Sequence, residues 1–228
     1  MDKIAIIVAA GSGTRMGSAL PKQFLPLAGK PVILHTLEAF IEAFPQIKII
    51  LVLPEHQLAH GRTLVQDKQY KEQVVFTPGG NSRFESVARG LALVDTESLV
   101  AVHDGVRCLV TPALIRRAFE SAAINGSAIP VLPVADSLRK IASLEDNPSS
   151  YSIDRDTIRA VQTPQAFQVN LLKKAYAKPF QNSFTDEASV VEAMGEQVHL
   201  IEGEPENIKI TRPLDLFIAE AVIRQRLL

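Results

Sequence analysis

The stretch from Ile4 to Lys22, IAIIVAAGSGTRMGSALPK, decides how the rest of this chain can be arranged. Its first part, Ile4 to Ala10, is an unbroken apolar run rich in β-branched residues, which is typical of a strand buried on both faces of a parallel sheet. Glycines then allow a sharp turn whose backbone N–H groups point inward, as a cradle for phosphate oxygens requires. These glycines are Gly11, Gly13 and Gly17. The stretch therefore predicts a strand followed by an anion-binding loop.

Two cations, Arg15 and Lys22, lie in the same stretch. Arginine offers a planar fork and lysine a point charge, and both suit a polyphosphate. The spacing does not match a P-loop, because no Lys-Ser or Lys-Thr pair follows the glycines. A dinucleotide fingerprint is weak, since the third glycine comes one residue late and the later acid, Glu38, lies inside a helical pattern. A turn with a purely structural role would explain the same pattern.

Length and composition limit the class of protein. The 228 residues suit one large α/β domain, and we expect a single domain over 1–228. With 24 basic and 25 acidic residues, the chain has no overall charge that would attract nucleic acid or an anionic membrane. The single cysteine, Cys108, cannot form an internal disulfide, and the first residues lack a secretory pattern, so we expect a cytoplasmic protein. The apolar runs are far shorter than the roughly 20 residues of a membrane span.

Strand and helix patterns alternate along the chain, which favours an α/β fold with a mostly parallel sheet and helices on both faces. We expect strands at 4–10, 47–53, 74–77, 99–103, 127–134, 198–201 and 207–211. We expect helices at 33–44, 55–68, 84–94, 112–123, 169–176, 186–194 and 214–227. Pro and Gly make 21–31 an ordered loop, and two N-caps are predicted, Ser82 with Glu85 and Thr185. The last helix is expected to bury Phe217, Ile218, Ala221 and Val222.

The strand at 99–103 ends in His103-Asp104-Gly105-Val106-Arg107. Ligands collect outside the carboxyl ends of parallel strands, so Asp104 is expected on the same edge as the glycine loop. An acid beside a polyphosphate is a natural metal partner, but an Asp that caps a turn explains the pattern equally well. His103 is expected to be packed at the strand end, because no second ligand lies at metal spacing.

The segment 136–162 is too polar to be core, and it contains the turn-forming run 146–150. We interpret it as a protruding β-hairpin arm with Arg155 and Arg159 on its return strand. An isolated two-stranded ribbon is marginally stable, so we expect the arm to pack against another subunit.

Several blocks of the sequence, in order, resemble 2-C-methyl-D-erythritol 4-phosphate cytidylyltransferases, and together they cover nearly the whole chain. The first is A-A-G-S-G-T-R-M-G followed by P-K-Q-F at 21–24. The others are Gly79-Gly80 with Arg83, Ser86 and Val87; His103-Asp104 with Arg107; Thr163-Pro164-Gln165 with Phe167; 185–190 (TDEASV); and 207–211 (NIKIT).

The resemblance implies a Rossmann-like nucleotidyltransferase fold and a homodimer with exchanged arms. It implies the reaction of CTP with 2-C-methyl-D-erythritol 4-phosphate to give the CDP-linked product and pyrophosphate, a step of non-mevalonate isoprenoid synthesis. It also implies that Arg15 and Lys22 stabilise the transition state. By the same resemblance, Lys209 and the Arg155 of the partner subunit orient the acceptor. CTP contacts fall on Ala9, Ala10, Gly11, Gly13, Gly80, Asn81, Ser86, Asp104 and Gly105. Acceptor contacts fall on Asp104, Arg107, Ser137, Arg155, Thr163, Thr185 and Lys209.

The chain departs from the family pattern at a few positions. Gly105, Val106 and Cys108 stand where the family commonly has Ala, Ala and Pro. Because the proline is absent, we expect a looser turn after Arg107. Asn81 stands where an acid is often found, and Ser137 where threonine is usual. The charge that grows on the leaving pyrophosphate calls for fixed cations and Mg²⁺ or another divalent ion, with Asp104 as the candidate metal contact.

Two other functions stay open at this point. A ribitol 5-phosphate cytidylyltransferase would share the fold and most motifs and differ chiefly in the acceptor. A protein that binds CTP or a sugar phosphate without turnover is less favoured, because a sensor does not need cations on both sides of the α-phosphate.

Overall fold

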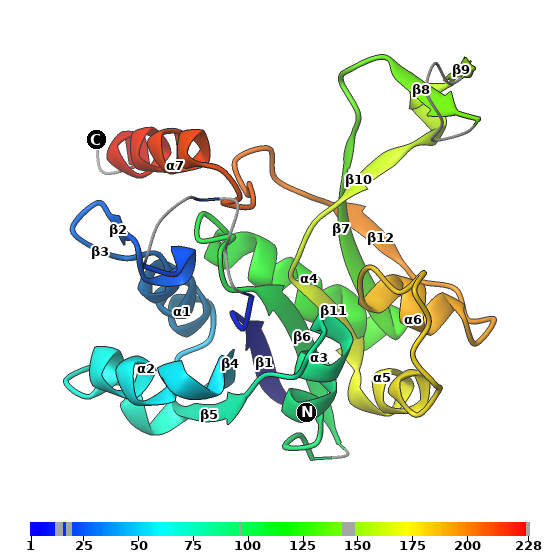
Figure 1. Cartoon of the computed structure of the whole chain (residues 1–228). Coiled ribbons are helices and arrows are strands. Elements are labelled where there is room, and N and C mark those ends of the chain that lie inside the picture. The colour runs from blue at the N-terminus through cyan, green and yellow to red at the C-terminus, as the bar shows by residue number, and fades with distance from the viewer. Residues whose placement is uncertain (12–15, 17–19, 96, 143–148, 227–228) are drawn as a thin grey trace.

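Figure 1 shows the computed structural model of the chain, which describes residues 1–11, 16, 20–95, 97–142 and 149–226. Its strands are β1 Asp2–Val8, β2 Pro26–Leu27, β3 Lys30–Pro31, β4 Lys48–Leu53, β5 Val74–Pro78, β6 Ser98–Asp104, β7 Ser127–Pro133, β8 Leu138–Ile141, β9 Ser150–Ile153, β10 Arg159–Val161, β11 Gln165–Gln168 and β12 Leu200–Glu202. Its helices are α1 Val32–Ala43, α2 Leu58–Val65, α3 Arg83–Leu91, α4 Pro112–Asn125, α5 Val169–Tyr176, α6 Glu187–Glu192 and α7 Pro213–Arg226.

Eight strands of the described residues form one sheet in the order β10-β7-β11-β6-β1-β4-β5, with β12 paired to β7. β1 lies between β4 and β6 and runs parallel to both, and β5 runs parallel to β4. β11 runs antiparallel to its neighbours β6 and β7. The expected α/β fold with a mostly parallel sheet is therefore confirmed. None of the helices in the described ranges is long and apolar enough to cross a membrane.

The register of β1 brings several loops to one edge of the sheet. Val8 pairs with Asp104 of β6 and with Val52 of β4. The adjacent strand β5 ends at Pro78, which pairs with Leu53. Because these parallel strands end together, the segments that follow them gather outside their carboxyl ends, where α/β proteins bind ligands.

Helices cover both faces of the sheet, as Figure 1 shows. On β1, Ala5 and Ile7 belong to the apolar cluster formed with α1, α2 and α4. Ile4 and Ile6 belong to the cluster on the other face, formed with α3, α5 and α6. Alternate side chains of a strand point to opposite faces, so a strand covered on both sides must be apolar throughout. This explains the unbroken apolar run that starts at Ile4.

The closing helix α7 packs differently from the expectation. Ala219 is fully buried in a third cluster, with Val222 packed beside it. Phe217 is 71% exposed and Ile218 is 44% exposed, and Ala221 is also exposed. The prediction that these three side chains are buried was wrong, because apolar residues occur on more than one side of this helix and do not mark a single face.

Three local predictions need correction. Residues 21–31 were predicted to be an ordered loop without regular elements, but they contain a helical turn, Lys22–Phe24, and the two-stranded ribbon β2–β3. Residues 207–211 do not form a strand; the N–H of Ile210 instead donates to the carbonyl of Val106, which holds this segment over the sheet edge. The N-cap of α6 is Asp186, one residue after the predicted Thr185.

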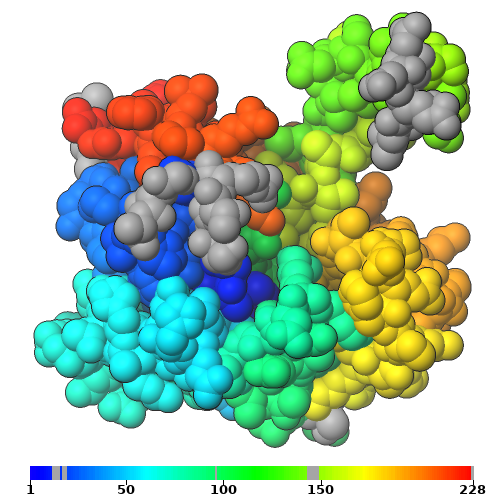
Figure 2. Space-filling view, viewed as in Figure 1, coloured from blue at the N-terminus to red at the C-terminus, as the bar shows by residue number. Residues whose placement is uncertain are grey.

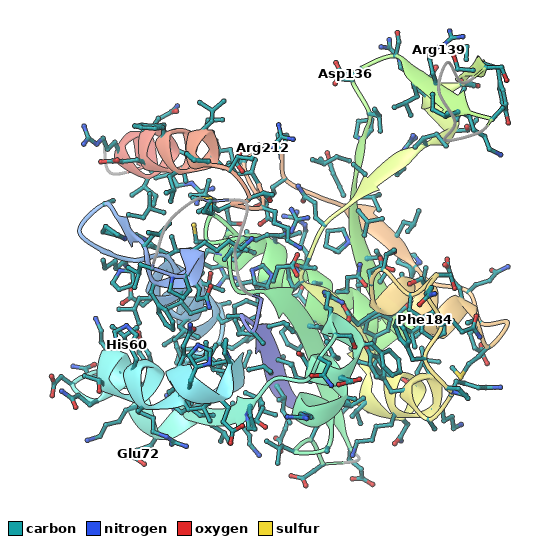
Figure 3. The ribbon with its side chains drawn as sticks, in the orientation of Figure 1. His60, Glu72, Asp136, Arg139, Phe184 and Arg212 are labelled. Atoms are coloured by element: carbon teal, nitrogen blue, oxygen red, sulfur yellow. The ribbon has the colours of Figure 1, made fainter. Side chains whose placement is uncertain are left out.

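Strands β8 and β9 form a separate antiparallel pair that stands clear of the main body in Figure 2. Figure 3 labels Asp136 and Arg139 on this part of the chain, and the Arg139 guanidinium donates to Ser150 of the paired strand. The return path differs from the expectation: Arg155 lies in a short helical turn, and Arg159 lies on β10, which pairs with β7 of the main sheet.

Gly90 offers a test of how closely α3 approaches the sheet. A Cβ atom at this position would lie 2.8 Å from Ile6 Cγ2, closer than a normal contact. We expect Gly90→Ala to lower the free energy of unfolding by about 1–3 kcal/mol, because α3 must move away from β1. Urea unfolding measures this. A rise in stability of about 0.5–1 kcal/mol, as in a helix with open space, would contradict the close approach.

Candidate active site

A cavity of about 530 Å³ opens at the carboxyl edge of the sheet. Figure 2 shows a hollow near the middle of this face, between blue, teal and orange segments of the chain. Its lining comes from the loop after β1, the start of α3, the end of β6 and the segment before α7. The residues are Val8, Ala9, Ala10, Gly11, Lys22, Gln23, Gly80, Asn81, Ser82, Arg83, Ser86, Asp104, Val106, Lys209 and Thr211.

Lys22 and Gln23 form one wall of this cavity. The Lys22 ammonium donates to the carbonyl of Ile210 at 2.9 Å, which ties the N-terminal segment to the segment before α7. Gln23 is buried and donates to the carbonyl of Ala9 at 2.9 Å, so it fixes the backbone directly after β1. The predicted site residues Gly13 and Arg15 lie outside the described residues.

The opposite wall is the start of α3. The hydroxyl of Ser82 accepts a hydrogen bond from the N–H of Glu85, as predicted for the N-cap. The Glu85 carboxylate accepts from the N–H of Asn81 rather than of Ser82, so the reciprocal bond of a capping box is displaced by one residue. A Cβ on Gly80 would lie 2.3 Å from Glu85 Cβ, and glycine is therefore required here. These contacts hold the loop in one conformation.

Asp104 lies among three cations. Its carboxylate is 2.9 Å from Lys209 Nζ, 3.4 Å from Arg107 Nε and 3.5 Å from Arg83 Nε. Burial acts to raise the pKa of this carboxyl, but Arg83, then Lys209 and Arg107, hold it well below its usual range. Asp104 is therefore ionised at neutral pH.

A second cavity of about 240 Å³ adjoins the first. It is lined by Arg83, Asp104, Arg107, Val161, Gln162, Thr163, Gln165, Thr185, Asp186 and Lys209. Arg83, Asp104 and Lys209 line both cavities. A charged boundary between two adjoining hollows suits two anionic ligands that must meet.

The predicted site residues that the structure describes fall into three groups. Most line a cavity: Ala9, Ala10, Gly11, Lys22, Gly80, Asn81, Ser86, Asp104 and Lys209 the larger, and Arg107, Thr163 and Thr185 the smaller. Gly105 is buried beside the first group, where its N–H donates to the carbonyl of Val8. Ser137 and Arg155 are exposed on the β8–β9 side of the molecule and line neither cavity.

Four residues of the cavity walls, Arg83, Gln23, Gln165 and Asp186, had no role predicted from the sequence. All four were part of family blocks, and for Arg83 its place three residues after Gly80 was the available signal. Gln165 donates to the Asp186 carboxylate at 2.8 Å and accepts from the N–H of Ala188, so it anchors the start of α6. Contacts of this kind join distant segments and have no local pattern.

The side chains that line the cavities limit how a divalent cation could be held. Among the described residues, no group of three or more His, Cys, Asp or Glu side chains could hold a metal ion. Within the same part of the chain, Asp104 is the single carboxylate in the lining of the larger cavity. Both oxygens of this carboxylate are already ion-paired, Oδ1 with Arg83 and Oδ2 with Arg107 and Lys209. A Mg²⁺ ion here would therefore be held mainly by phosphate oxygens and water, with Asp104 as one protein ligand, which is common for this ion.

His103 is completely buried behind Asp104, with Nδ1 3.0 Å from Thr163 Oγ1 and Nε2 3.1 Å from the carbonyl of Arg107. Burial is the largest effect on His103 and lowers its pKa to about 3. The negative charge of Asp104 acts to raise this pKa, and the positive charges of Arg107 and Lys209 lower it by smaller amounts. The side chain is neutral at pH 7, and it is expected to be a packing residue rather than a base.

This burial predicts how stability depends on pH. Below the unfolded pKa of about 6.5, the unfolded chain binds a proton at His103 that the folded chain rejects until about pH 3. As the pH is lowered from 6 to 4, we expect the free energy of unfolding to fall by about 1.4 kcal/mol per pH unit. His35, whose pKa is also lowered by burial, contributes in the same direction. Urea unfolding across this range measures the slope. His103→Gln should flatten it by about one proton, and an unchanged slope would assign the dependence to other groups.

Comparisons with known proteins agree with this geometry. The family model described as 2-C-methyl-D-erythritol 4-phosphate cytidylyltransferase matches residues 3–225. A protein of that name from Bacteroides thetaiotaomicron is 49% identical over 98% of this chain and 100% of its own length. One from Bacillus velezensis is 40% identical over 98% of this chain and 97% of its own.

Solved structures of similar proteins share the fold. The crystal structure of 2-C-methyl-D-erythritol 4-phosphate cytidylyltransferase from Thermus thermophilus has a TM-score of 0.77 and 35% identity, covering 98% of this chain and 100% of that one. The 4-diphosphocytidyl-2C-methyl-D-erythritol synthase of Anaerococcus prevotii has a TM-score of 0.83 and 28% identity, covering 98% and 96%. The resemblance in the sequence blocks is confirmed, and the chain belongs to the 2-C-methyl-D-erythritol 4-phosphate cytidylyltransferase family.

Proposed function

We propose that this chain transfers the cytidylyl group of CTP to 2-C-methyl-D-erythritol 4-phosphate and releases pyrophosphate, as a nucleotidyltransferase of non-mevalonate isoprenoid precursor synthesis. Membership of the family and relatives of that name at 40–49% identity support the reaction. The observation that carries the proposal is the pair of adjoining cavities whose shared boundary contains Arg83, Asp104 and Lys209.

The larger cavity is the proposed CTP site. Ala10, Gly11 and Gly80 line its walls. The N–H of Gly80 donates to the Ser86 hydroxyl, so we infer that the backbone N–H groups of Ala10 and Gly11 are the ones that meet phosphate oxygens. Asn81 and Ser86 supply polar groups at the start of α3, with Lys22 on the facing wall. We infer that Gly13 and Arg15, from the same loop as Gly11, complete the contacts to the triphosphate.

The smaller cavity is the proposed acceptor site. Arg107 and Lys209 supply positive charge, and Thr185 supplies a hydroxyl group, for a polyol phosphate. Thr163 lines the same cavity, but its hydroxyl accepts from the N–H of Asp104 and lies 3.0 Å from His103 Nδ1, so we infer that it holds the wall in place. Arg107 is held in place because its guanidinium also donates to the carbonyl of Asn207 at 2.8 Å. An acceptor phosphate bound here lies next to the boundary that the two cavities share.

The reaction needs no base from the protein. A phosphomonoester with a second pKa of about 6 is already ionised at neutral pH, so its oxygen attacks the α-phosphorus directly while the bond to pyrophosphate breaks. The barrier lies in bringing two anions together and in the charge that grows on the leaving pyrophosphate. We propose that Arg15 and Lys22 stabilise this charge, and that Lys209 and Arg155 orient the acceptor.

We propose that Mg²⁺, or another divalent cation, enters with the triphosphate and contacts Asp104. When bound, the ion neutralises phosphate charge and orients the triphosphate. The rest of the alignment belongs to the side chains described above.

We propose that the chain acts as a cytoplasmic homodimer of single nucleotidyltransferase domains, joined through the arm at about 136–162. Arg155 and Ser137 are exposed on this part of the chain, and neither lines a cavity of its own subunit. The arm also exposes Ile141 (45%) and Tyr151 (52%), which suits contact with a second copy. Arg155 then completes the acceptor site of the partner.

The acceptor is tested by pyrophosphate release with CTP and Mg²⁺. We expect kcat/KM for 2-C-methyl-D-erythritol 4-phosphate to exceed that for D-ribitol 5-phosphate by about tenfold or more, because the two polyols differ in branching and length. The reverse preference would replace the acceptor and keep the CTP site. Titration with CTP that shows binding without release from either acceptor would indicate a non-catalytic binding protein.

The exchange of Arg155 is tested by mixing two defective variants. Lys22→Ala should lower kcat by ~10² or more, the scale of one preorganised charge contact. Arg155→Ala should raise KM for the acceptor and leave CTP affinity unchanged. In a mixed dimer, one of the two sites contains its own Lys22 and receives Arg155 from the other subunit. When equal amounts of the two variants are unfolded, mixed and refolded, about a quarter of wild-type activity should therefore return. Activity that stays at the sum of the two variants would place Arg155 in its own subunit's site.

A further inference from the structure

Glu187, the first residue of α6, is a carboxylate completely removed from solvent. Its two oxygens accept from the two terminal nitrogens of Arg83, at 2.5 and 2.9 Å. The Tyr176 hydroxyl donates to the same carboxylate at 3.0 Å. Burial, followed by the charge of Glu187, raises the pKa of Tyr176, so the phenol remains a donor. None of the roles described above accounts for this buried carboxylate.

Arg83 connects Glu187 to the candidate active site. With both terminal nitrogens on Glu187, its Nε lies 3.5 Å from Asp104 Oδ1, and Arg83 lines both cavities. Burial acts to lower the pKa of Arg83, but Glu187 and then Asp104 raise it above its ordinary value. A bidentate pair of this kind fixes the orientation of the guanidinium plane as well as its position.

The pair also joins the walls of the two cavities. Arg83 begins α3, directly after Gly80 to Ser82 of the larger cavity, and Glu187 begins α6, directly after Thr185 and Asp186 of the smaller one. Aromatic packing supports the same junction. Phe84 stacks on Tyr176 with ring centroids 4.5 Å apart, and Phe184 lies 5.8 Å from Phe84 on the α6 side, where Figure 3 labels it.

We propose that Glu187 is a positioning residue for the transfer reaction: acting through Arg83, it fixes the Asp104 carboxylate and the spacing between the nucleotide and acceptor walls. This inference rests on the proposed function, because it concerns the alignment of the same two substrates. An in-line displacement requires the reacting atoms within about 3–3.5 Å of each other, and a misplacement of about 1 Å can cost about a hundredfold in rate.

Glu187→Gln tests the proposal, since glutamine keeps the volume and removes the charge. At a temperature well below the unfolding midpoint, we expect kcat to fall about a hundredfold. We expect the Kd for CTP, measured by titration, to change by no more than about twofold, because Ser82 and Glu85 hold the nucleotide loop independently of Glu187. Arg83→Lys should cause a similar loss, because lysine cannot make the bidentate pair.

The double variant Arg83→Lys/Glu187→Gln shows whether the two residues act through one shared connection or have independent effects on kcat. Its kcat should be no lower than that of the worse single variant, because both changes break the same connection. Glu220→Gln is the matched control: it removes one partner of an exposed ion pair with Arg224 on α7, and its kcat should equal that of the wild type.

The outcomes distinguish this inference from the proposed function. Wild-type turnover of CTP and the acceptor tests the function itself, and its absence would refute both. If the wild type turns over and Glu187→Gln keeps the wild-type kcat, even with a lowered unfolding midpoint, Glu187 serves stability alone and the positioning role is refuted. A weakened CTP affinity that accounts for the whole loss of activity would also refute it.

Discussion

The ion pairs of the Asp104 carboxylate are the contacts on which the geometry of the candidate site depends. Arg83, Arg107 and Lys209 reach this carboxylate from three segments: the start of α3, the turn after β6 and the segment before α7. Burying one charge without partners costs several kcal/mol, so a carboxylate in this position requires its cations. The three cations in turn require the carboxylate, because their mutual repulsion would otherwise separate them. The cluster therefore sets where both cavities lie relative to the sheet.

Local patterns in the sequence were enough for the parts of the fold that depend on burial. The run from Ile4 to Ala10 indicated a central strand because both faces of β1 are covered, and Ser82 indicated the start of α3 because an N-cap satisfies backbone donors within a few residues. The edge that carries Gly11, Gly80 and Asp104 followed from the rule that parallel strands end together. Each of these inferences needs information from a single element or from neighbouring strands.

The remaining features depend on contacts between segments far apart in the chain. Residues 207–211 have a strand-like composition, but Ile210 pairs with Val106 rather than with a strand. The face of α7 is chosen by the cluster around Val32 and Leu109, so Ala219 is buried and Phe217 is not. The pairing of Arg83 with Glu187 spans 104 residues, and no spacing within either segment announces it. Composition predicts which residues are apolar or charged, and only the packed structure decides which partner each one finds.

The balance of charge in the site explains why alignment matters more here than proton transfer. The cavity walls carry four cations, Lys22, Arg83, Arg107 and Lys209, against three carboxylates, Asp104, Asp186 and the buried Glu187 behind Arg83. These seven described side chains leave an excess of one positive charge for incoming phosphates. A carboxylate that only neutralised these cations would weaken their attraction for the substrate phosphates. Asp104 holds Arg83, Arg107 and Lys209 at fixed distances, and Glu187 holds Arg83. In the proposed reaction, this lowers the reorganisation required when charge moves to the leaving group. Mobile cationic side chains would attract the same phosphates, but the entropy lost in ordering them would oppose every turnover. Because buried carboxylates hold these cations in place beforehand, that entropy is lost once, when the protein folds.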